Sequence, residues 1–416
     1  MPGNFLEENI MRKHKLLFSI TAALTVLLSG CASVDGENSK PDNASNPAVN
    51  SNLGAGVNNT ISDNSSNSNY PEKCKIYKAS MIKFSDEQLF DFFNERPECG
   101  TPQKSEYYSD ESHRYEADGC AGYIDWDHDF FFWTDNGTYY HSVQYYLSHR
   151  EDSENHDESL INSHEDLDFL SRDEALKAVQ KELSERFGIS PDDWYAFKFD
   201  TVKKEGVELG KQQAYRDAYE PEKVYEGDDL EKEKQYYERI KDIPADDFYY
   251  FNIKYKVDDM SMFMGSFLDI GDWTSSRRSI LGPRTEIIYG RNGLEYVFIY
   301  PAYKVDTANY VEADIIPYDE ARGLVQKKYD DLLTDKIPEV LAMNFSLLPI
   351  PKNGLNEHGN CELRPHYGFY TKKTEEYKGE TYDVFELIYF DAVTGEELAT
   401  EQIMELDLPA EWGFDL

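Results

Sequence analysis

The sequence predicts an α+β protein in which two or three modules, each a helix packed on an antiparallel β-sheet, follow a disordered tether. Three observations lead to this prediction. The 416 residues suit two or three domains. Helix-start signatures recur along the chain, and each precedes segments rich in aromatic and β-branched residues, as strands are. Aromatic residues make up 14% of the chain, which is enough to build cores.

The N-terminal residues have the features of an export signal. A basic segment, residues 11–15, precedes an apolar run over residues 16–28 that is too short to span a bilayer as a helix. The run ends in Leu-Ser-Gly-Cys at Cys31, which resembles the lipobox of bacterial lipoproteins. The resemblance implies that the sulfur of Cys31 carries a diacylglycerol and that residues 1–31 hold the signal peptide and lipobox. Met11 is a hypothetical alternative start to Met1, because the residues before it have no place in a signal peptide.

Residues 32–72 are predicted to be a disordered, Asn- and Ser-rich tether. The segment has few large apolar side chains, so it cannot bury enough surface to offset the entropy of ordering. Of the net charge of −38, residues 1–30 contribute +1 and residues 31–70 contribute −3, so the folded part carries −36. This acidity argues against a nucleic-acid binder, which needs a basic surface.

Residues 73–165 are predicted to form a helix followed by an antiparallel meander. Ser85 and Gln88 fit a capping box, and Phe84 can pack on Leu89 as a hydrophobic staple. Strand-like segments follow at residues 122–126, 130–133 and 138–147.

Residues 166–312 are predicted to form a second module that contains a charged insertion. Ser171 and Glu174 fit a capping box at the start of a helix, and Gly188 suits the C-terminal cap of the same helix. The insertion, residues 211–241, is expected to be partly helical. Strands are expected at residues 194–202, 248–257, 285–289 and 294–300.

Residues 313–416 are predicted to form a third module, whose helix begins near Pro317. Here the chain repeats itself: FLSRDEALKAVQKEL at 169–183 and IIPYDEARGLVQKKY at 315–329 match at six of fifteen positions, 146 residues apart. Two matched triplets in one register favour a true repeat over two convergent amphipathic helices. Further strands are expected at residues 340–348, 363–370 and 381–390, with a tight turn at 391–398 leading into the last strand.

Two segments of the third module carry a family resemblance. The helix start Asp-Glu-Ala at 319–321 and the hairpin motif Phe-Asp-Ala-x-Thr-Gly-Glu at 390–396 resemble a PepSY-type module. The resemblance covers residues 313–416 well and residues 166–312 weakly, where the Thr-Gly-Glu turn is missing. The whole layout is also similar to uncharacterised lipoproteins of Gram-positive anaerobes. The resemblance implies small, cystatin-like helix-on-sheet units, known from protease propeptides and exported protease modulators, and hence a binding module.

Four cysteines remain besides Cys31, and they allow three pairings. Export permits disulfides, and Cys99 and Cys120 are near enough in sequence to bridge a hairpin-like loop. Free, buried thiols are an equal alternative, so the states of Cys74, Cys99, Cys120 and Cys361 stay open.

The chain lacks Gly-x-Ser-x-Gly, His-Glu-x-x-His and Walker sequences, so no catalytic residue, metal site or cofactor is predicted. Asp125, Asp127 and Asp129 alternate, but a calcium loop starting there would need a Gly and a Glu that are missing, so a solvated turn is expected. Three histidines lie near carboxylates, fit no common helix face and are expected in a loop: His149, His156 and His164. Many of the 31 tyrosines fall in strand-like segments and are expected to pack.

The function predicted first is non-catalytic. We expect an extracellular lipoprotein, anchored through Cys31 to the outer face of the cell membrane, that binds an envelope protein or modulates a protease. The first alternative is a carbohydrate- or small-ligand-binding lipoprotein, which would show coplanar exposed aromatic rings. The second is a secreted hydrolase, which would show two close carboxylates with perturbed pKa values.

Overall fold

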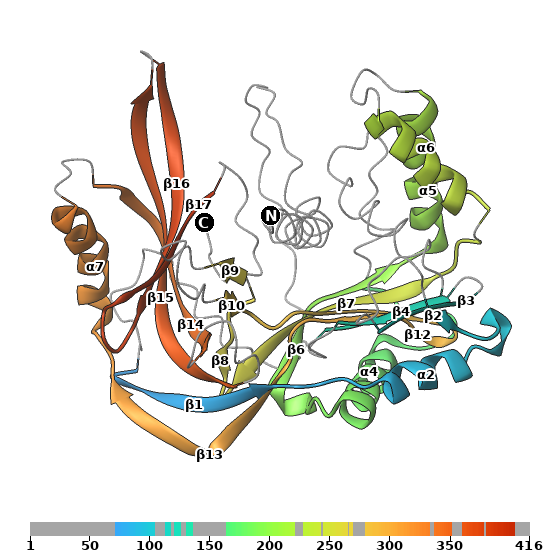
Figure 1. The fold of residues 1–416 in the computed structure, drawn as a ribbon, viewed down its shortest axis with the longest axis horizontal. Coiled ribbons are helices and arrows are strands. Elements are labelled where there is room, and N and C mark those ends of the chain that lie inside the picture. The colour runs from blue at the N-terminus through green and yellow to red at the C-terminus, as the bar shows by residue number, and fades with distance from the viewer. Residues whose placement is uncertain are drawn as a thin grey trace, which may run out of the picture.

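The computed structural model shows a mixed α/β protein that is rich in antiparallel strands (Figure 1). The structure describes residues 71–104, 113–117, 120–125, 130–135, 164–220, 228–242, 244–264, 266–268, 279–332, 337–351, 360–377 and 380–403. The predicted α+β class is confirmed at this coarse level. The expected signal peptide and nearly all of the expected tether lie outside the described residues, as does the expected strand at 138–147.

The larger sheet has nine strands, and all its pairings are antiparallel. Its order is β2 (Gln103–Lys104), β3 (His113–Ala117), β4 (Cys120–Ile124), β5 (Phe131–Thr134), β12 (Gly293–Ile299), β11 (Thr285–Gly290), β7 (Phe248–Val257) and β6 (Trp194–Val202), with β8 (Met260–Ser261) paired to β7. The pairing of β5 with β12 joins two stretches that lie far apart in the sequence.

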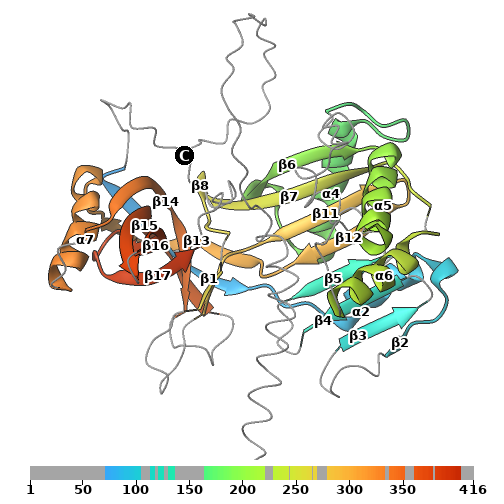
Figure 2. The same ribbon diagram turned by 90° about the horizontal axis from the view of Figure 1, so that it is seen from above.

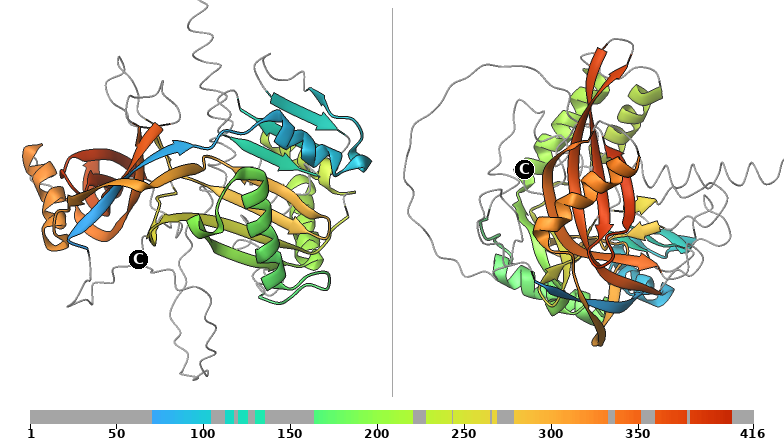
Figure 3. Two further views of the ribbon diagram at one scale, coloured as in Figure 1. Left: turned by 90° about the horizontal axis from the view of Figure 1, so that it is seen from below. Right: turned by 90° about the vertical axis from the view of Figure 1, so that its left-hand side faces the viewer.

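Helices α2 (Asp86–Asn94) and α4 (Arg172–Phe187) lie on one face of this sheet (Figure 3). Both begin with the predicted capping boxes. In each, the side chain of the N-cap Ser accepts a hydrogen bond from the backbone N–H of the third helical residue, and the side chain of that residue accepts one from the backbone N–H of the Ser. Gly188 ends α4 in the left-handed conformation, as predicted. Leu89, Phe92 and Val179 are buried in the core that these helices share with the sheet.

Helices α5 (Lys204–Tyr219) and α6 (Asp228–Ile240) lie over the opposite face of the sheet (Figure 2). They fill much of the charged insertion that was expected to be partly helical. Val207 of α5 belongs to a small buried cluster with Phe248, Ile288 and Tyr296 of the sheet. Helix α5 is therefore attached to the sheet through an apolar contact.

The second sheet has six strands and carries α7 (Tyr318–Asp331) on one face (Figure 3). Its order is β13 (Tyr303–Asp314), β1 (Lys73–Met81), β15 (Asn360–Tyr377), β16 (Glu380–Asp391) and β17 (Glu397–Ile403), with β14 (Glu339–Pro351) also paired to β15. Ala321 and Val325 of α7 pack with Phe369 and Ile388 of the sheet. Strands β9 (Ser266–Leu268) and β10 (Ser279–Leu281) pair with each other in a separate two-stranded sheet.

Strands β1 and β13 cross the module boundaries that the sequence suggested. They belong to the six-stranded sheet, although β1 begins the expected first module and β13 ends the expected second one. Neither strand was predicted. Strand β13 is exposed along most of its length, so it lacks an alternating apolar pattern.

The β7–β8 hairpin ties the two sheets together. Asp258 and Asp259 at its tip both have positive φ, as a two-residue hairpin of this kind requires. One carboxylate oxygen of Asp258 accepts from Lys75 Nζ at 2.6 Å and from Tyr77 Oη at 2.7 Å, both on β1. These bonds attach the first strand of the six-stranded sheet to the edge of the nine-stranded one.

The cysteine question has a definite outcome. Cys99 and Cys120 form a disulfide, whereas Cys74 and Cys361 are free and buried. Burial raises the pKa of Cys74 to about 11 and that of Cys361 to about 12, so both stay thiols at neutral pH. The bridge joins the segment after α2 to the first residue of β4.

Candidate functional site

Most residues that the sequence singled out for chemistry or lipid attachment lie outside the described part of the chain. These are Cys31, Asp127, Asp129, His149 and His156. Asp125 is described, and its Oδ1 accepts a bond from the Phe130 N–H at 3.2 Å. His164 is exposed. Within the described ranges, no cluster of three or more His, Cys, Asp or Glu side chains is arranged to hold a metal ion. The helices that the structure describes include none long and apolar enough to cross a membrane.

A serine, a histidine and an aspartate lie side by side across three strands of the six-stranded sheet, which sequence reasoning did not foresee. Ser346 pairs with His366, and His366 pairs with Asp391. The imidazole Nδ1 lies 2.7 Å from the Ser346 carbonyl oxygen, and Nε2 lies 3.4 Å from its hydroxyl. The Asp391 carboxylate accepts instead from Arg364 Nε at 2.5 Å and from two backbone N–H groups of the next turn.

This row does not have the geometry of a catalytic triad. In a triad the carboxylate orients the imidazole, and the imidazole acts as a base near neutral pH. Here Asp391 is engaged elsewhere, and complete burial lowers the pKa of His366 to about 3. The row therefore cross-links strands. Asp391 also bonds to the backbone of the turn before β17, in which Gly395 has φ of 71°, and this turn lies within the tight turn predicted at residues 391–398.

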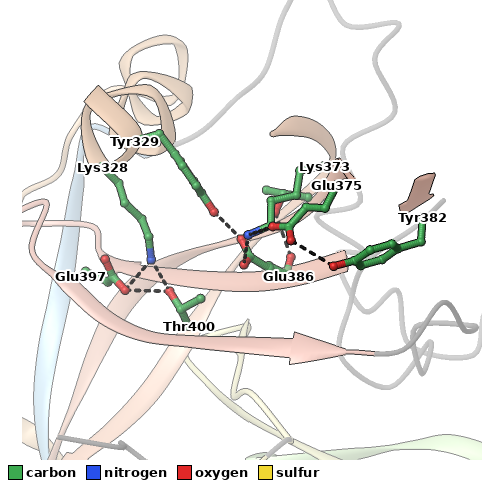
Figure 4. A network of polar contacts seen from close by, with 9 residues as sticks. Lys328, Tyr329, Lys373, Glu375, Tyr382, Glu386, Glu397 and Thr400 are labelled. Atoms are coloured by element: carbon green, nitrogen blue, oxygen red, sulfur yellow. Dashed lines mark hydrogen bonds and ion pairs between the residues drawn. The ribbon is translucent and has the colours of Figure 1, made fainter. Parts of the chain in front are cut away.

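A network of polar side chains surrounds Glu386, beside the C-terminal end of α7 (Figure 4). The Glu386 carboxylate, 12% exposed, accepts from the Tyr329 hydroxyl and from Lys373 Nζ at 2.9 Å. Lys373 also contacts Glu375 at 3.1 Å, and Glu375 accepts from the Tyr382 hydroxyl at 3.3 Å. Burial and the Glu386 carboxylate raise the pKa of Tyr329, so its proton stays in place. The charges of Glu386 and Glu375 are thus balanced by Lys373 and by hydrogen bonds from tyrosines, and we interpret the network as structural.

A neighbouring contact fastens the end of α7 to β17 (Figure 4). Lys328 Nζ lies 2.6 Å from a Glu397 carboxylate oxygen and 2.5 Å from the Thr400 hydroxyl. The hydroxyl itself donates to Glu397 at 2.6 Å. Each polar group in this contact has a fixed partner, which suits attachment of a helix rather than proton transfer.

Two carboxylates face each other across the junction of β5 and β12. The Asp135 N–H donates to the Glu295 carbonyl oxygen at 3.0 Å, which places the two residues opposite each other on neighbouring strands. Burial raises the pKa of Asp135 to about 6 against the opposing effect of Arg96. Burial, together with the charge of Asp135, raises the pKa of Glu295 to about 7.

Arg96 and Gly290 enclose this acidic pair. Arg96 Nε lies 3.3 Å from the Asp135 carboxylate, and its Nη2 donates to two carbonyl oxygens of the β11–β12 hairpin at 2.8 and 3.1 Å. A Cβ at Gly290 would lie 2.0 Å from a carboxylate oxygen of Glu295, so only glycine leaves room for that side chain. The pair has the perturbed pKa values expected of an acid–base site, but it is packed against backbone and an arginine.

Two exposed tyrosines and one half-buried tyrosine form a cluster on the α5–α6 pair, which we call the tyrosine cluster: Tyr215 and Tyr219, which are exposed, and Tyr237. The ring centroids of Tyr215 and Tyr219 lie 5.3 Å apart, and Tyr237 lies 5.3 and 5.6 Å from them. Tyr215 is 41% exposed and Tyr219 is 43% exposed. The four-residue spacing of Tyr215 and Tyr219 in a partly helical segment is a sequence signal that could have identified this surface.

The comparisons with known proteins assign no family. No family model matches the chain, and no curated protein matches it. One similar solved structure is that of an uncharacterized protein from Eubacterium rectale ATCC 33656, determined at 1.45 Å resolution. It is 14% identical, has a TM-score of 0.43, and the match covers 79% of this chain and 86% of that one. A likeness at this level carries no functional assignment.

Proposed function

We propose that this chain is an exported, lipid-anchored protein that binds a protein partner at the cell surface and catalyses no reaction. The observation that carries the proposal is the tyrosine cluster. Buried tyrosines contribute to cores, but adjacent tyrosines that are 41% and 43% exposed offer amphipathic contact area to another molecule. The ring contacts within the cluster limit the entropy that binding would cost.

The order of elements supports the finer proposal of three related helix-on-sheet modules. Each of α2, α4 and α7 is followed by four strands that pair in sequence, namely β2–β5, then β6, β7, β11 and β12, then β14–β17. The two matching sequence segments supply equivalent positions 146 residues apart: α4 begins at Arg172 and α7 at Tyr318. The buried residues of α4 and α7 follow the same offset: Ala175 and Ala321, Val179 and Val325, Leu183 and Tyr329. This agreement favours the PepSY-like reading, and with it a role in binding or modulating a protease.

The lipid anchor is tested by exchanging one atom. The full chain and its Cys31→Ser variant are produced in a Gram-positive host grown with a clickable palmitate analogue. The proposal expects label and membrane association for the wild type, and no label with release into the medium for the variant. Equal labelling of the two chains would contradict lipidation at Cys31.

Binding is tested by site-specific photo-crosslinking on intact cells. The full chain carries benzoylphenylalanine in place of Tyr215 in one sample and of Tyr310 in the control. Tyr310 is a good match because it is 45% exposed but lies on β13, in the other sheet. The proposal expects a discrete protein adduct from position 215 only. The absence of any adduct, or the same adducts from both positions, would count against a partner at the tyrosine cluster.

A secreted hydrolase is a second candidate, favoured by the Asp135 and Glu295 pair with its raised pKa values. The full chain would be assayed against cell-wall glycans and casein, together with a Glu295→Gln variant. Hydrolysis by the wild type that is lost in the variant would establish this candidate and overturn the non-catalytic proposal.

A further inference from the structure

We propose that the tyrosine cluster binds a basic segment of the partner, so that an arginine or lysine side chain lies on the exposed tyrosine rings. The inference rests on the proposed function and adds the chemistry of the partner to it. A cation over an aromatic face is attracted by the ring quadrupole, and arginine is the commonest such cation. Three features of the structure lead to this partner.

The first feature is the rigidity of the surface. The Tyr219 hydroxyl donates to Glu238 Oε1 at 2.8 Å, so α5 is bonded to α6 through the cluster itself. The other oxygen of Glu238 accepts from Lys241 Nζ at 2.5 Å. The ring of Tyr237 stands at 66° to that of Tyr215 and at 82° to that of Tyr219, so it makes edge-to-face contacts with both. The ring faces are therefore held in place before a partner arrives.

The second feature is the way that this chain uses its other aromatic faces. Arg172 lies 3.8 Å from the ring centroid of Phe199, Arg186 lies 4.6 Å from that of Phe92, and Lys75 lies 4.5 Å from that of Tyr310. Over the rings of the tyrosine cluster, by contrast, no cation of the described residues is seated. An arginine or lysine of a partner can take the place that the chain's own cations take elsewhere.

The third feature is charge. The folded part carries −36 of the net charge of −38, which attracts a basic segment over a distance and raises its association rate. Close to the rings, hydrogen bonds from Lys241 and Tyr219 lower the pKa of Glu238, so this carboxylate is an anion at neutral pH. A basic segment thus finds ring faces and the Glu238 carboxylate within one patch.

A sugar is the other occupant that exposed tyrosines suit. Sugar binders present aromatic platforms that a flat ring can cover, whereas Tyr215 and Tyr219 are tilted by 32° to each other. A net-acidic surface also contributes nothing to holding a neutral glycan. The observations therefore favour a basic peptide, and sugar binding becomes an outcome of the test.

The experiment measures binding of a fluorescent, glycine-spaced tri-arginine peptide to the full chain by fluorescence anisotropy at about 0.15 M salt, where long-range attraction is screened. The control peptide replaces arginine by citrulline, which keeps the shape and removes the charge. Tyr215→Leu/Tyr219→Leu removes two ring faces but keeps apolar bulk, and Tyr215→Phe/Tyr219→Phe keeps the faces. Tyr310→Leu is the matched control on the other sheet. Circular dichroism establishes that each variant is folded.

We expect the leucine pair to weaken binding of the arginine peptide about tenfold, as loss of two exposed cation–π contacts implies. The phenylalanine pair and the Tyr310 variant should bind within about threefold of the wild type, and the citrulline peptide should bind no variant measurably better than another. Equal binding by the leucine pair and the wild type would overturn the inference, because the acidic surface alone would then account for affinity. Tyrosine-dependent binding to insoluble cell-wall glycan instead of the peptide would also overturn it.

Failure of this inference can be told apart from failure of the proposed function. An adduct at position 215 whose partner segment contains no arginine or lysine would keep the proposed function and refute the basic segment. No adduct at all would contradict the proposed function itself.

Discussion

Replacing Glu295 by glutamine should stabilise the protein at alkaline pH and leave it nearly unchanged at acidic pH. Burial and the charge of Asp135 raise the pKa of Glu295 from 4.5 to about 7. The folded protein therefore holds a proton that the unfolded chain releases between these two values, so stability falls as pH rises through this window. Above it, the ionised Glu295 carboxylate opposes folding.

The magnitude follows from the size of the shift. One pKa unit corresponds to about 1.4 kcal/mol, so the full shift corresponds to a penalty of up to about 3 kcal/mol at pH 8. Glutamine has the same shape and no charge. We expect Glu295→Gln to raise the free energy of unfolding by about 1–3 kcal/mol at pH 8 and by little at pH 5, where Glu295 is already protonated.

The assay is urea denaturation at pH 5 and pH 8 with the Cys99–Cys120 disulfide intact. Other titrating groups cancel because the variant is compared with the wild type at each pH. Glu339→Gln, which alters an exposed carboxylate on β14, serves as the control and should change neither value. Greater destabilisation of Glu295→Gln at pH 8 than at pH 5 would refute the reasoning, because the carboxylate would then be a stabilising anion.

Three further substitutions test other parts of the structure by unfolding measurements. Gly290→Ala forces the Glu295 carboxylate from its place and should lower the free energy of unfolding by about 1–2 kcal/mol. Gly290→Ala/Glu295→Ala should recover most of this loss. An equal loss in both variants would show that the alanine disturbs the backbone instead. His366→Gln should flatten the loss of stability as pH falls from 6.5 toward 3, by up to about 1.4 kcal/mol per pH unit, because the unfolded chain takes up a proton that the buried ring does not. Glu386→Gln should lower the free energy of unfolding by about 2–3 kcal/mol, because Lys373 then loses a charged partner. Glu386→Met/Lys373→Met removes both charges and should lower it by less. Thermal melts that rank the two variants in the opposite order would contradict this prediction.

Local patterns predicted many of the elements well. The expected strands at residues 194–202 and 248–257 coincide with β6 and β7, because aromatic and β-branched residues run through both. The capping boxes at Ser85 and Ser171 lie where they were predicted, because a cap depends on residues only three positions apart.

The remaining elements depend on pairings between distant segments. Strand β15 is eighteen residues long, while only its apolar centre, residues 363–370, was predicted. Its outer part carries Lys372, which bridges to Asp383 of β16 at 2.6 Å and so has no apolar pattern to reveal it. Charge pairs across a hairpin maintain this strand where a hydrophobic face does not.

The candidate sites were missed for the same reason. Asp135 follows the predicted strand at residues 130–133, but it lies opposite Glu295, and nothing local indicates that β5 pairs with β12. The tyrosine cluster was predicted in part, because its three residues lie in the segment, residues 211–241, that was expected to be partly helical. Its exposure depends on how α5 and α6 pack, which the sequence pattern alone does not define.

The position of β1 has a consequence for the order in which the protein folds. This strand is synthesised early, whereas its partners, residues 303–314 and 360–363, follow more than two hundred residues later. Such non-local contacts slow folding, since a loop of more than two hundred residues must close before the strand is paired. Until then β1 is an unpaired edge, and a chain cut short before β15 would leave it without one neighbour. The six-stranded sheet therefore completes only after its late strands, β13 to β17, have been synthesised, which makes the pairing of β1 a late step of folding.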